Sequence, residues 1–156
     1  MILNAAGIFK SFVTDSERIE ILKGLHLAID RPEIIALMGR SGSGKSTLLS
    51  ILTGLDRPDQ GSIEILDENM LALTAKEANR FRFENIGIIF QQFHLLDHLT
   101  ARENVRLPWD LQGKRGGDER ALAELAKVGL QNREKHFPSK LSKGECQRVA
   151  IARLLM

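Results

Sequence analysis

The sequence predicts an α/β protein in which an N-terminal antiparallel β-subdomain is followed by a parallel core sheet and a helical subdomain. Apolar and polar residues alternate over residues 2–29, which is typical of half-buried strands. Residues 34–38 and 86–90 are almost continuously apolar, as strands buried on both faces of a parallel sheet are. Residues 74–83 and 118–128 space their apolar side chains helically. Together these patterns predict strands and helices that alternate along one chain.

The composition excludes several classes of protein. A length of 156 residues favours a single domain, and 43% hydrophobic with 27% charged residues is typical of a globular protein and not of a disordered one. The net charge of +2 lacks the basic excess of a nucleic-acid-coating protein, so no nucleic-acid partner is expected. The single cysteine, Cys146, excludes an internal disulfide and fits a reducing cytosol. No apolar run approaches the ~20 residues that span a bilayer, and no signal peptide is expected.

The elements follow in order. Residues 2–29 predict an antiparallel edge or hairpin, interrupted by a polar stretch at 14–18. The strand at 34–38 leads directly into GRSGSGKST, and a helix over 47–55 follows. A second helix over 74–83 is expected to face inward through Ala75, Ala78 and Phe81.

The remaining elements make up the helical part of the chain. The strand at 86–90 ends at Gln91. The helix over 118–128 has the clearest boundaries: Asp118 is expected as its N-cap, Gly129 as its C′ residue and Leu130 as the apolar contact beyond it.

Residues 39–46, which we call the phosphate loop, match the G-x-x-x-x-G-K-[ST] pattern between the predicted strand and helix. The glycines allow backbone N–H groups to surround phosphate oxygens. Lys45 adds a charge for the β- and γ-phosphates, and the Ser46 hydroxyl a ligand for Mg²⁺. The alternative is a Gly/Ser-rich linker without a ligand. The predicted nucleotide-binding residues are Gly39, Arg40, Ser41, Gly42, Ser43, Gly44, Lys45, Ser46 and Thr47.

A second motif lies near the C-terminus, in LSKGECQRVAIAR. Ser142 and Glu145 have the spacing of a capping box, so a helix is expected to begin there. Gly144 leaves the first-turn amides uncovered, and such a helix N-terminus is suited to bind phosphate. An ordinary capped helix is the equally supported alternative. Cys146 is expected to be a surface cysteine, although a helix N-terminus could favour its thiolate.

GRSGSGKST, IIFQQFHLL and LSKGECQRVAIAR, in that order, resemble the Walker A, Q-loop and signature motifs of ABC-transporter ATP-binding subunits. The resemblance covers nearly the whole chain and implies a P-loop NTPase fold of the ABC type. LTGLDRPDQGSI and HLTARENVRLP further resemble the lipoprotein-releasing and macrolide-exporting ATPases. The implied division is a β-subdomain and P-loop core at 1–91, a helical subdomain at 92–140, and the signature motif with its helix at 141–156.

The resemblance implies a role for several further residues. Phe12 takes the place of the aromatic residue that stacks on adenine, with a core position as the alternative. Gln91 matches the glutamine that senses Mg²⁺ and the γ-phosphate and couples to the membrane subunit. The signature residues bind the γ-phosphate of ATP held by an opposite subunit, so a head-to-tail dimer is implied; they are Ser142, Lys143, Gly144 and Glu145. Lys143 departs from the family, which usually has glycine there.

The implied function is that of a bacterial ABC-transporter subunit that uses ATP and Mg²⁺ to drive export or lipoprotein release. Its partners would be transmembrane permease subunits and a second ATP-binding subunit, at the cytoplasmic face of the inner membrane. Family members also have an Asp and a Glu after a second apolar strand, and a later His; no continuously apolar strand that ends in Asp-Glu occurs in this sequence. The alternative is therefore a truncated, non-hydrolysing nucleotide-binding module. A soluble kinase or GTPase lacks support, since neither an acceptor site nor a guanine-specific motif is found.

Three lesser features have less specific interpretations. His94 and His98 would adjoin on a helix and could form a metal pair, but a surface turn is preferred. Trp109 is expected to contribute packing or a partner contact, and Lys114 and Arg115 a solvated loop.

Overall fold

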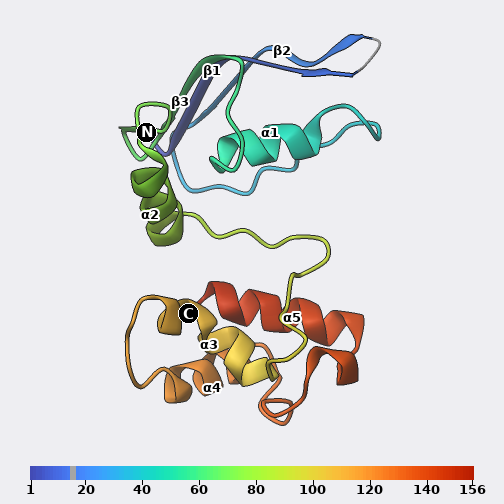
Figure 1. Ribbon diagram of the computed structural model, residues 1–156, viewed down its shortest axis with the longest axis vertical. Helices are drawn as coiled ribbons and strands as arrows, with labels where there is room; N and C mark the ends of the chain where they lie inside the picture. The colour runs from blue at the N-terminus through green and yellow to red at the C-terminus, as the bar shows by residue number, and fades with distance from the viewer. Residues whose placement is uncertain (15–16) are drawn as a thin grey trace. The chain divides into compact units, whose positions relative to one another are not determined.

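The computed structural model describes residues 1–14 and 17–156; Asp15 and Ser16, within the predicted polar stretch, lie outside the described residues. The chain forms two compact units, Met1–Ile86 and Gly87–Met156. The first contains the sheet and two helices, and the second is helical (Figure 1). Among residues 1–14 and 17–156, none of the helices has the length and hydropathy of a transmembrane segment.

The sheet of the first unit is antiparallel and has the strand order β2-β1-β3-β4. Strands β1 (Leu3–Val13) and β2 (Arg18–Ile29) form the predicted hairpin, with Phe12 opposite Ile19. Strand β3 (Gln60–Ile65) pairs with the other edge of β1, and β4 (Glu68–Asn69) completes the sheet. The apolar side chains that alternate along β1 to β3 supply most of the first core.

Helices α1 (Lys45–Leu52) and α2 (Ala75–Asn85) also belong to this unit. Helix α1 begins two residues before the predicted start and buries one apolar face. Of the predicted inward residues of α2, Phe81 packs against the core, but Ala75 is exposed because it opens the first turn, ahead of the part that reaches the core. The buried core residues are Ala5, Ile8, Leu22, Leu48, Ile51, Leu52, Ile63, Ile65 and Met70.

The two predicted parallel strands are not formed. Residues 34–38 and 86–90 have no regular secondary structure, and Ile34 and Met38 are 101% and 87% exposed. An apolar segment becomes a strand only where a neighbour can share its backbone hydrogen bonds. Among the described residues, no strand pairs with either segment. The α/β class of the ABC type is confirmed, whereas its parallel core sheet is absent from the described part of the chain.

The second unit contains α3 (Ala101–Leu111), α4 (Asp118–Lys127), the 3₁₀ turn η1 (Pro138–Lys140) and α5 (Lys143–Leu154). Helix α4 ends as predicted: Gly129 has φ 73°, and the buried Leu130 donates its N–H to the Leu125 carbonyl at 2.8 Å. Its core consists of Ala101, Val105, Ala121, Leu125, Leu130, Val149 and Ala152.

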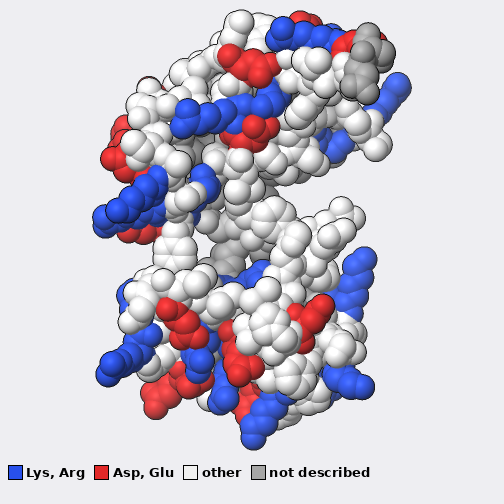
Figure 2. Space-filling view, viewed as in Figure 1, with Lys and Arg blue, Asp and Glu red and all other residues white. Residues whose placement is uncertain are grey.

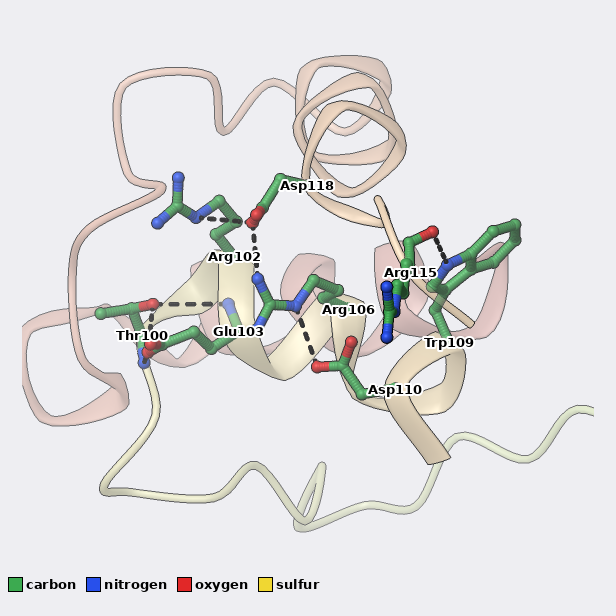
Figure 3. A network of polar contacts seen from close by, with 8 residues as sticks. All are labelled: Thr100, Arg102, Glu103, Arg106, Trp109, Asp110, Arg115 and Asp118. Atoms are coloured by element: carbon green, nitrogen blue, oxygen red, sulfur yellow. Dashed lines mark hydrogen bonds and ion pairs between the residues drawn. The ribbon is translucent and has the colours of Figure 1, made fainter. Parts of the chain in front are cut away.

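The prediction that Asp118 caps α4 is wrong, because Gly117 is the N-cap and Asp118 lies in the first turn. The Asp118 carboxylate instead joins α4 to α3. It accepts from Arg106 Nη1 at 2.8 Å and lies 3.4 Å from Arg102 Nε, and both arginine side chains point toward it from α3 (Figure 3). Arg106 also pairs with Asp110, at 2.9 Å. This ionic network fixes the start of α4 against α3.

The loop that joins α3 to α4 is held by Trp109. The indole Nε1 donates to the Arg115 carbonyl at 3.1 Å (Figure 3). Lys114 Nζ lies 4.7 Å, and the Arg120 guanidinium carbon 5.2 Å, from the ring centroid, within range of a cation–π contact. The predicted solvated loop is exposed, but its Lys114 also packs on Trp109.

Asn104, in α3, fixes the turn that precedes this helix. The residue is fully buried. Its Oδ1 accepts from the Leu96 N–H at 2.8 Å, and its Nδ2 donates to the carbonyls of Leu96, Leu99 and Thr100 at 3.0, 3.0 and 3.1 Å. One amide side chain therefore closes the whole 96–100 turn.

Candidate functional site

The phosphate loop turns sharply back toward the sheet before α1. Gly42 and Gly44 have φ of 79° and 88°, the left-handed region that side chains disfavour. A Cβ on Gly44 would lie 2.7 Å from Ile21 Cγ2 and 3.3 Å from Leu22 Cδ2. Glycine at this position therefore permits both the turn and its close approach to β2.

Within residues 1–14 and 17–156, the N-terminus of α1 has neither a side-chain cap nor an acidic residue in its first turn, whereas α4, which also lacks a side-chain cap, has Asp118 and Glu119 in its first turn. Helices α2, α3 and α5 each begin with a capping box, formed by Thr74, Thr100 and Ser142 respectively. Helix α1 has Gly44 as its N-cap, and among the described residues no side chain caps it and no acidic residue lies in its first turn. Its first N–H groups lack intrahelical acceptors, and the helix dipole favours an anion there.

A pocket of about 420 Å³ opens at this end of α1. Six of its lining residues are predicted nucleotide-binding residues: Ser41, Gly42, Gly44, Lys45, Ser46 and Thr47. The seventh, Ile21 of β2, was not predicted, because its alternating pattern places it on a strand without showing what the strand faces. No acidic side chain is among these lining residues, so the pocket is suited to anionic groups.

The Lys45 ammonium lies over the loop. It donates to the carbonyls of Gly39 and Arg40 at 2.8 and 2.7 Å, and lies 3.4 Å from Ser43 Oγ. All three acceptors are neutral, and the ion pairs of residues 1–14 and 17–156 do not include Lys45. The positive charge of Lys45 is therefore not neutralised by a carboxylate and is available to an anionic ligand.

Phe12 lies on β1 and is 46% exposed, so the alternative that placed it in the core is wrong. Lys10 Nζ lies 5.6 Å from its ring centroid. The ring does not line the pocket at α1. That Phe12 stacks on adenine stays a prediction.

Gln91 lies in the second unit, at the start of an exposed turn. Phe93 and His94 have φ of 60° and 46°, and His94 and His98 lie in two separate turns, with no helix over residues 94–98. The helical adjacency that a His94–His98 metal pair needs is absent, so the preferred interpretation as a turn is confirmed. The described residues contain no group of three potential metal-ligating side chains.

The signature residues form the predicted capping box at the start of α5. Glu145 N donates to Ser142 Oγ at 3.2 Å, and Glu145 Oε2 accepts from Ser142 N at 2.8 Å. Arg133 Nε donates to Glu145 Oε1 at 2.9 Å. The bond from the Ser142 backbone, followed by the one from Arg133, lowers the pKa of Glu145 to about 2.

Residues next to the capping box differ in exposure. Lys143 and Gly144 are exposed. Cys146 is half-buried, and its thiol contacts the Pro138 carbonyl at 3.7 Å. Burial, followed by the charges of Glu145 and Asp97, raises the pKa of Cys146, so the helix N-terminus does not favour its thiolate.

Charged residues of both signs are interspersed over the visible face of each unit (Figure 2). The phosphate loop and its pocket lie in the first unit, whereas Gln91 and the signature residues lie in the second. The structure thus forms each predicted motif locally. The phosphate loop combines a pocket, a helix N-terminus without a side-chain cap, and a lysine that has no carboxylate partner among residues 1–14 and 17–156.

The model of the family described as ABC transporter matches residues 22–156 of this chain. The chain belongs to the ABC transporter family. That match includes the phosphate loop, Gln91 and the signature residues.

Curated relatives and solved structures agree with this assignment. The chain is 45% identical to the lipoprotein-releasing system ATP-binding protein LolD of Cytophaga hutchinsonii, over 99% of this chain and 70% of that protein. It is also 45% identical to the macrolide export ATP-binding/permease protein MacB 1 of Aeromonas hydrophila, over 99% of this chain but 24% of that protein. The chain thus spans about a quarter of the length of this MacB relative and of a second MacB, from Chlorobium phaeobacteroides.

Among solved structures, a dimeric post-hydrolysis state of the ATP-binding cassette MJ0796, bound to ADP and Pi, matches with a TM-score of 0.90 and 38% identity. The match covers 99% of this chain and 69% of the cassette. At this identity and coverage, the chain has the fold of the matched part of the ABC cassette.

Proposed function

We propose that this chain is the nucleotide-binding part of an ABC transporter ATPase and that it binds Mg·ATP at the phosphate loop. The uncapped N-terminus of α1, open to the pocket behind Gly44, is the observation that carries the proposal. In that arrangement, backbone N–H groups at the helix start bind and orient phosphate oxygens. The fold of the related cassettes supports the same ligand class.

Lys45 and Ser46 complete the site. The Lys45 ammonium leaves its carbonyl acceptors and neutralises the β- and γ-phosphates. The Ser46 hydroxyl lines the pocket beside Lys45 and is the side chain there that suits Mg²⁺, which prefers oxygen ligands. Bound Mg²⁺ would neutralise part of the negative charge of the phosphates. Gln91 is the proposed supporting residue for Mg²⁺ and the γ-phosphate.

The proposal extends to the assembly. Ser142, Lys143, Gly144 and Glu145 act on nucleotide held by a second, head-to-tail subunit, as the dimeric state of the related cassette suggests. ATP hydrolysis drives transmembrane permease subunits at the cytoplasmic face of the inner membrane. The names of the LolD and MacB relatives favour lipoprotein release or macrolide export as the transport process. Residues 1–91, 92–140 and 141–156 serve as the nucleotide core, helical subdomain and signature element.

The test is Mg·ATP affinity, measured by calorimetry for the parent chain and Lys45→Ala. Loss of one charge-assisted contact, about 1.5–3 kcal/mol, corresponds to a roughly 10- to 150-fold weaker Kd. Lys76→Ala, at an exposed position on α2, is the matched control and should leave the Kd unchanged. Equal affinity of Lys45→Ala and the parent would reject the site.

A non-hydrolysing nucleotide-binding module is the second candidate, because the residues that line the pocket at α1 include no carboxylate that could activate a water molecule. Phosphate release separates the two candidates. Mg·ATP binding without phosphate release by this chain supports the module, whereas steady release that Lys45→Ala abolishes supports the hydrolase.

A further inference from the structure

Arg153, near the end of α5, joins two segments that are far apart in the sequence. Its Nη1 donates to the His94 carbonyl at 2.8 Å, and its Nη2 donates to the Phe93 carbonyl at 2.7 Å. The planar guanidinium presents donors in a fixed fork, which suits two consecutive carbonyl oxygens. A point-like ammonium cannot reproduce that geometry.

The two acceptor residues have an unfavourable backbone conformation. Phe93 and His94 both have left-handed φ, 60° and 46°, although neither is glycine. Such conformations are costly for residues other than glycine and persist where surrounding contacts hold them. Within the turn, Phe93 N donates to the Phe90 carbonyl at 3.0 Å and His94 N to the Gln92 carbonyl at 2.7 Å. Arg153 supplies the additional contacts from outside the turn.

The charge of Arg153 is compensated by these carbonyls. The side chain is half-buried, and burial lowers its pKa. The ion pairs of the described residues do not include Arg153. A partly desolvated guanidinium without a carboxylate partner depends on its hydrogen bonds, so its loss should affect the turn at 90–94 directly.

Gln91 lies inside this turn, two residues before the first acceptor carbonyl. Arg153 lies near the C-terminal end of α5 (Lys143–Leu154), and Ser142 is the N-cap of the same helix. We propose that Arg153 is a positioning residue that fixes the Gln91 turn to α5, and so sets how Gln91 meets the γ-phosphate. The functional half of this inference rests on the proposed Mg·ATP site.

The first measurement is hydrogen–deuterium exchange of the turn. In Arg153→Gln, amides in residues 90–96 should exchange at least about tenfold faster than in the parent chain, because two hydrogen bonds are lost. Exchange within α3 and α4 should stay unchanged. Arg148→Gln, an exposed arginine of the same helix, is the control and should leave the turn unchanged. Unchanged exchange in Arg153→Gln overturns the proposal.

The second measurement separates positioning from general destabilisation. If Arg153 acts through Gln91, Arg153→Gln should lower the preference for ATP over ADP about three- to tenfold while the Kd for ADP stays the same. Gln91→Ala should do the same, and the double variant should lose no more than Gln91→Ala alone. Equal weakening of both nucleotides, or losses that multiply in the double variant, would overturn the positioning role.

Arg153→Lys covers the case in which Arg153→Gln does not fold. It keeps the charge and the apolar stem but loses the fork, so the preference for ATP should fall to an intermediate value. A value equal to that of the parent overturns the proposal. Failure of the parent chain to bind Mg·ATP overturns the proposed function and with it this role, whereas normal binding with no effect of Arg153 overturns the role alone.

Discussion

Replacement of Asn104 by alanine tests how the second unit is held together. The side chain is fully buried and makes four hydrogen bonds to the backbone of Leu96, Leu99 and Thr100. Asn104→Ala removes the partner of one N–H and three carbonyls at once. At about 1 kcal/mol of net stabilisation per bond, with a further cost for the groups left without a partner, the variant should lose roughly 3–5 kcal/mol.

The assay is urea unfolding followed by the fluorescence of Trp109, the single tryptophan of the chain, which lies on the same helix as Asn104. Asn85→Ala is the matched control, because Asn85 is exposed and makes one bond, 3.0 Å, to the Phe81 carbonyl. That variant should change the free energy of unfolding by less than about 0.5 kcal/mol. A loss below about 1 kcal/mol for Asn104→Ala would refute the reasoning.

Asn104→Asp sharpens the same test through its pH dependence. The new carboxylate can still accept from the Leu96 N–H but faces three carbonyl oxygens. Burial and these oxygens raise the folded-state pKa of the aspartate above its ordinary value of about 3.9, so the folded state binds the proton more tightly. The variant should therefore become more stable as the pH falls from about 7 toward 4, and a flat profile would contradict this.

Three further predictions concern the two motifs. Gly44→Ala, whose Cβ would lie 2.7 Å from Ile21 Cγ2, should cost about 2–4 kcal/mol in calorimetric unfolding and abolish Mg·ATP binding. Gly113 has a similar left-handed φ of 69°, but no atom lies within 4 Å of an added Cβ. If Gly113→Ala loses as much stability as Gly44→Ala, the contact with Ile21 does not contribute to the loss. The pKa of Glu145 is lowered from 4.5 to about 2, so the stability that this carboxylate contributes above pH 4.5 is lost as the pH falls toward 2. Glu145→Gln should therefore lose less stability over this pH range in acid titrations followed by circular dichroism. Cys146, whose pKa is raised by burial, should react with a disulfide reagent several-fold more slowly than in the urea-unfolded chain, and equal rates would show that the thiol is freely accessible.

Local chemistry made much of the structure predictable from the sequence. The capping box of Ser142 and Glu145 and the glycine stop at Gly129 depend on neighbours three or four residues away, and both form as predicted. The same holds for the phosphate loop. Its glycines and Lys45 are at most six residues apart in the sequence, and this short separation is enough to bring them together. The hairpin also needs only adjacent segments.

The errors occur where distant segments decide the outcome. Residues 34–38 are apolar, but the sequence does not show whether a second strand is available to pair with them. Asp118 was predicted to cap its own helix, whereas its carboxylate accepts a hydrogen bond from Arg106, twelve residues earlier in the sequence. Ile21 lines the pocket and Arg153 binds the His94 carbonyl through tertiary contacts. No sequence motif indicates either contact.

The exposed apolar segment at 34–38 also affects how the chain behaves in solution. The segment has no regular secondary structure and pairs with no strand of the described residues, and Ile34, Ile35, Leu37 and Met38 are all exposed. An unpaired backbone with apolar side chains is a template for intermolecular β-pairing, the first step of cross-β assembly. Light scattering should therefore increase with protein concentration. Leu37→Lys, which places a charge in the middle of this segment, should delay the increase and leave the residues of the phosphate loop unchanged.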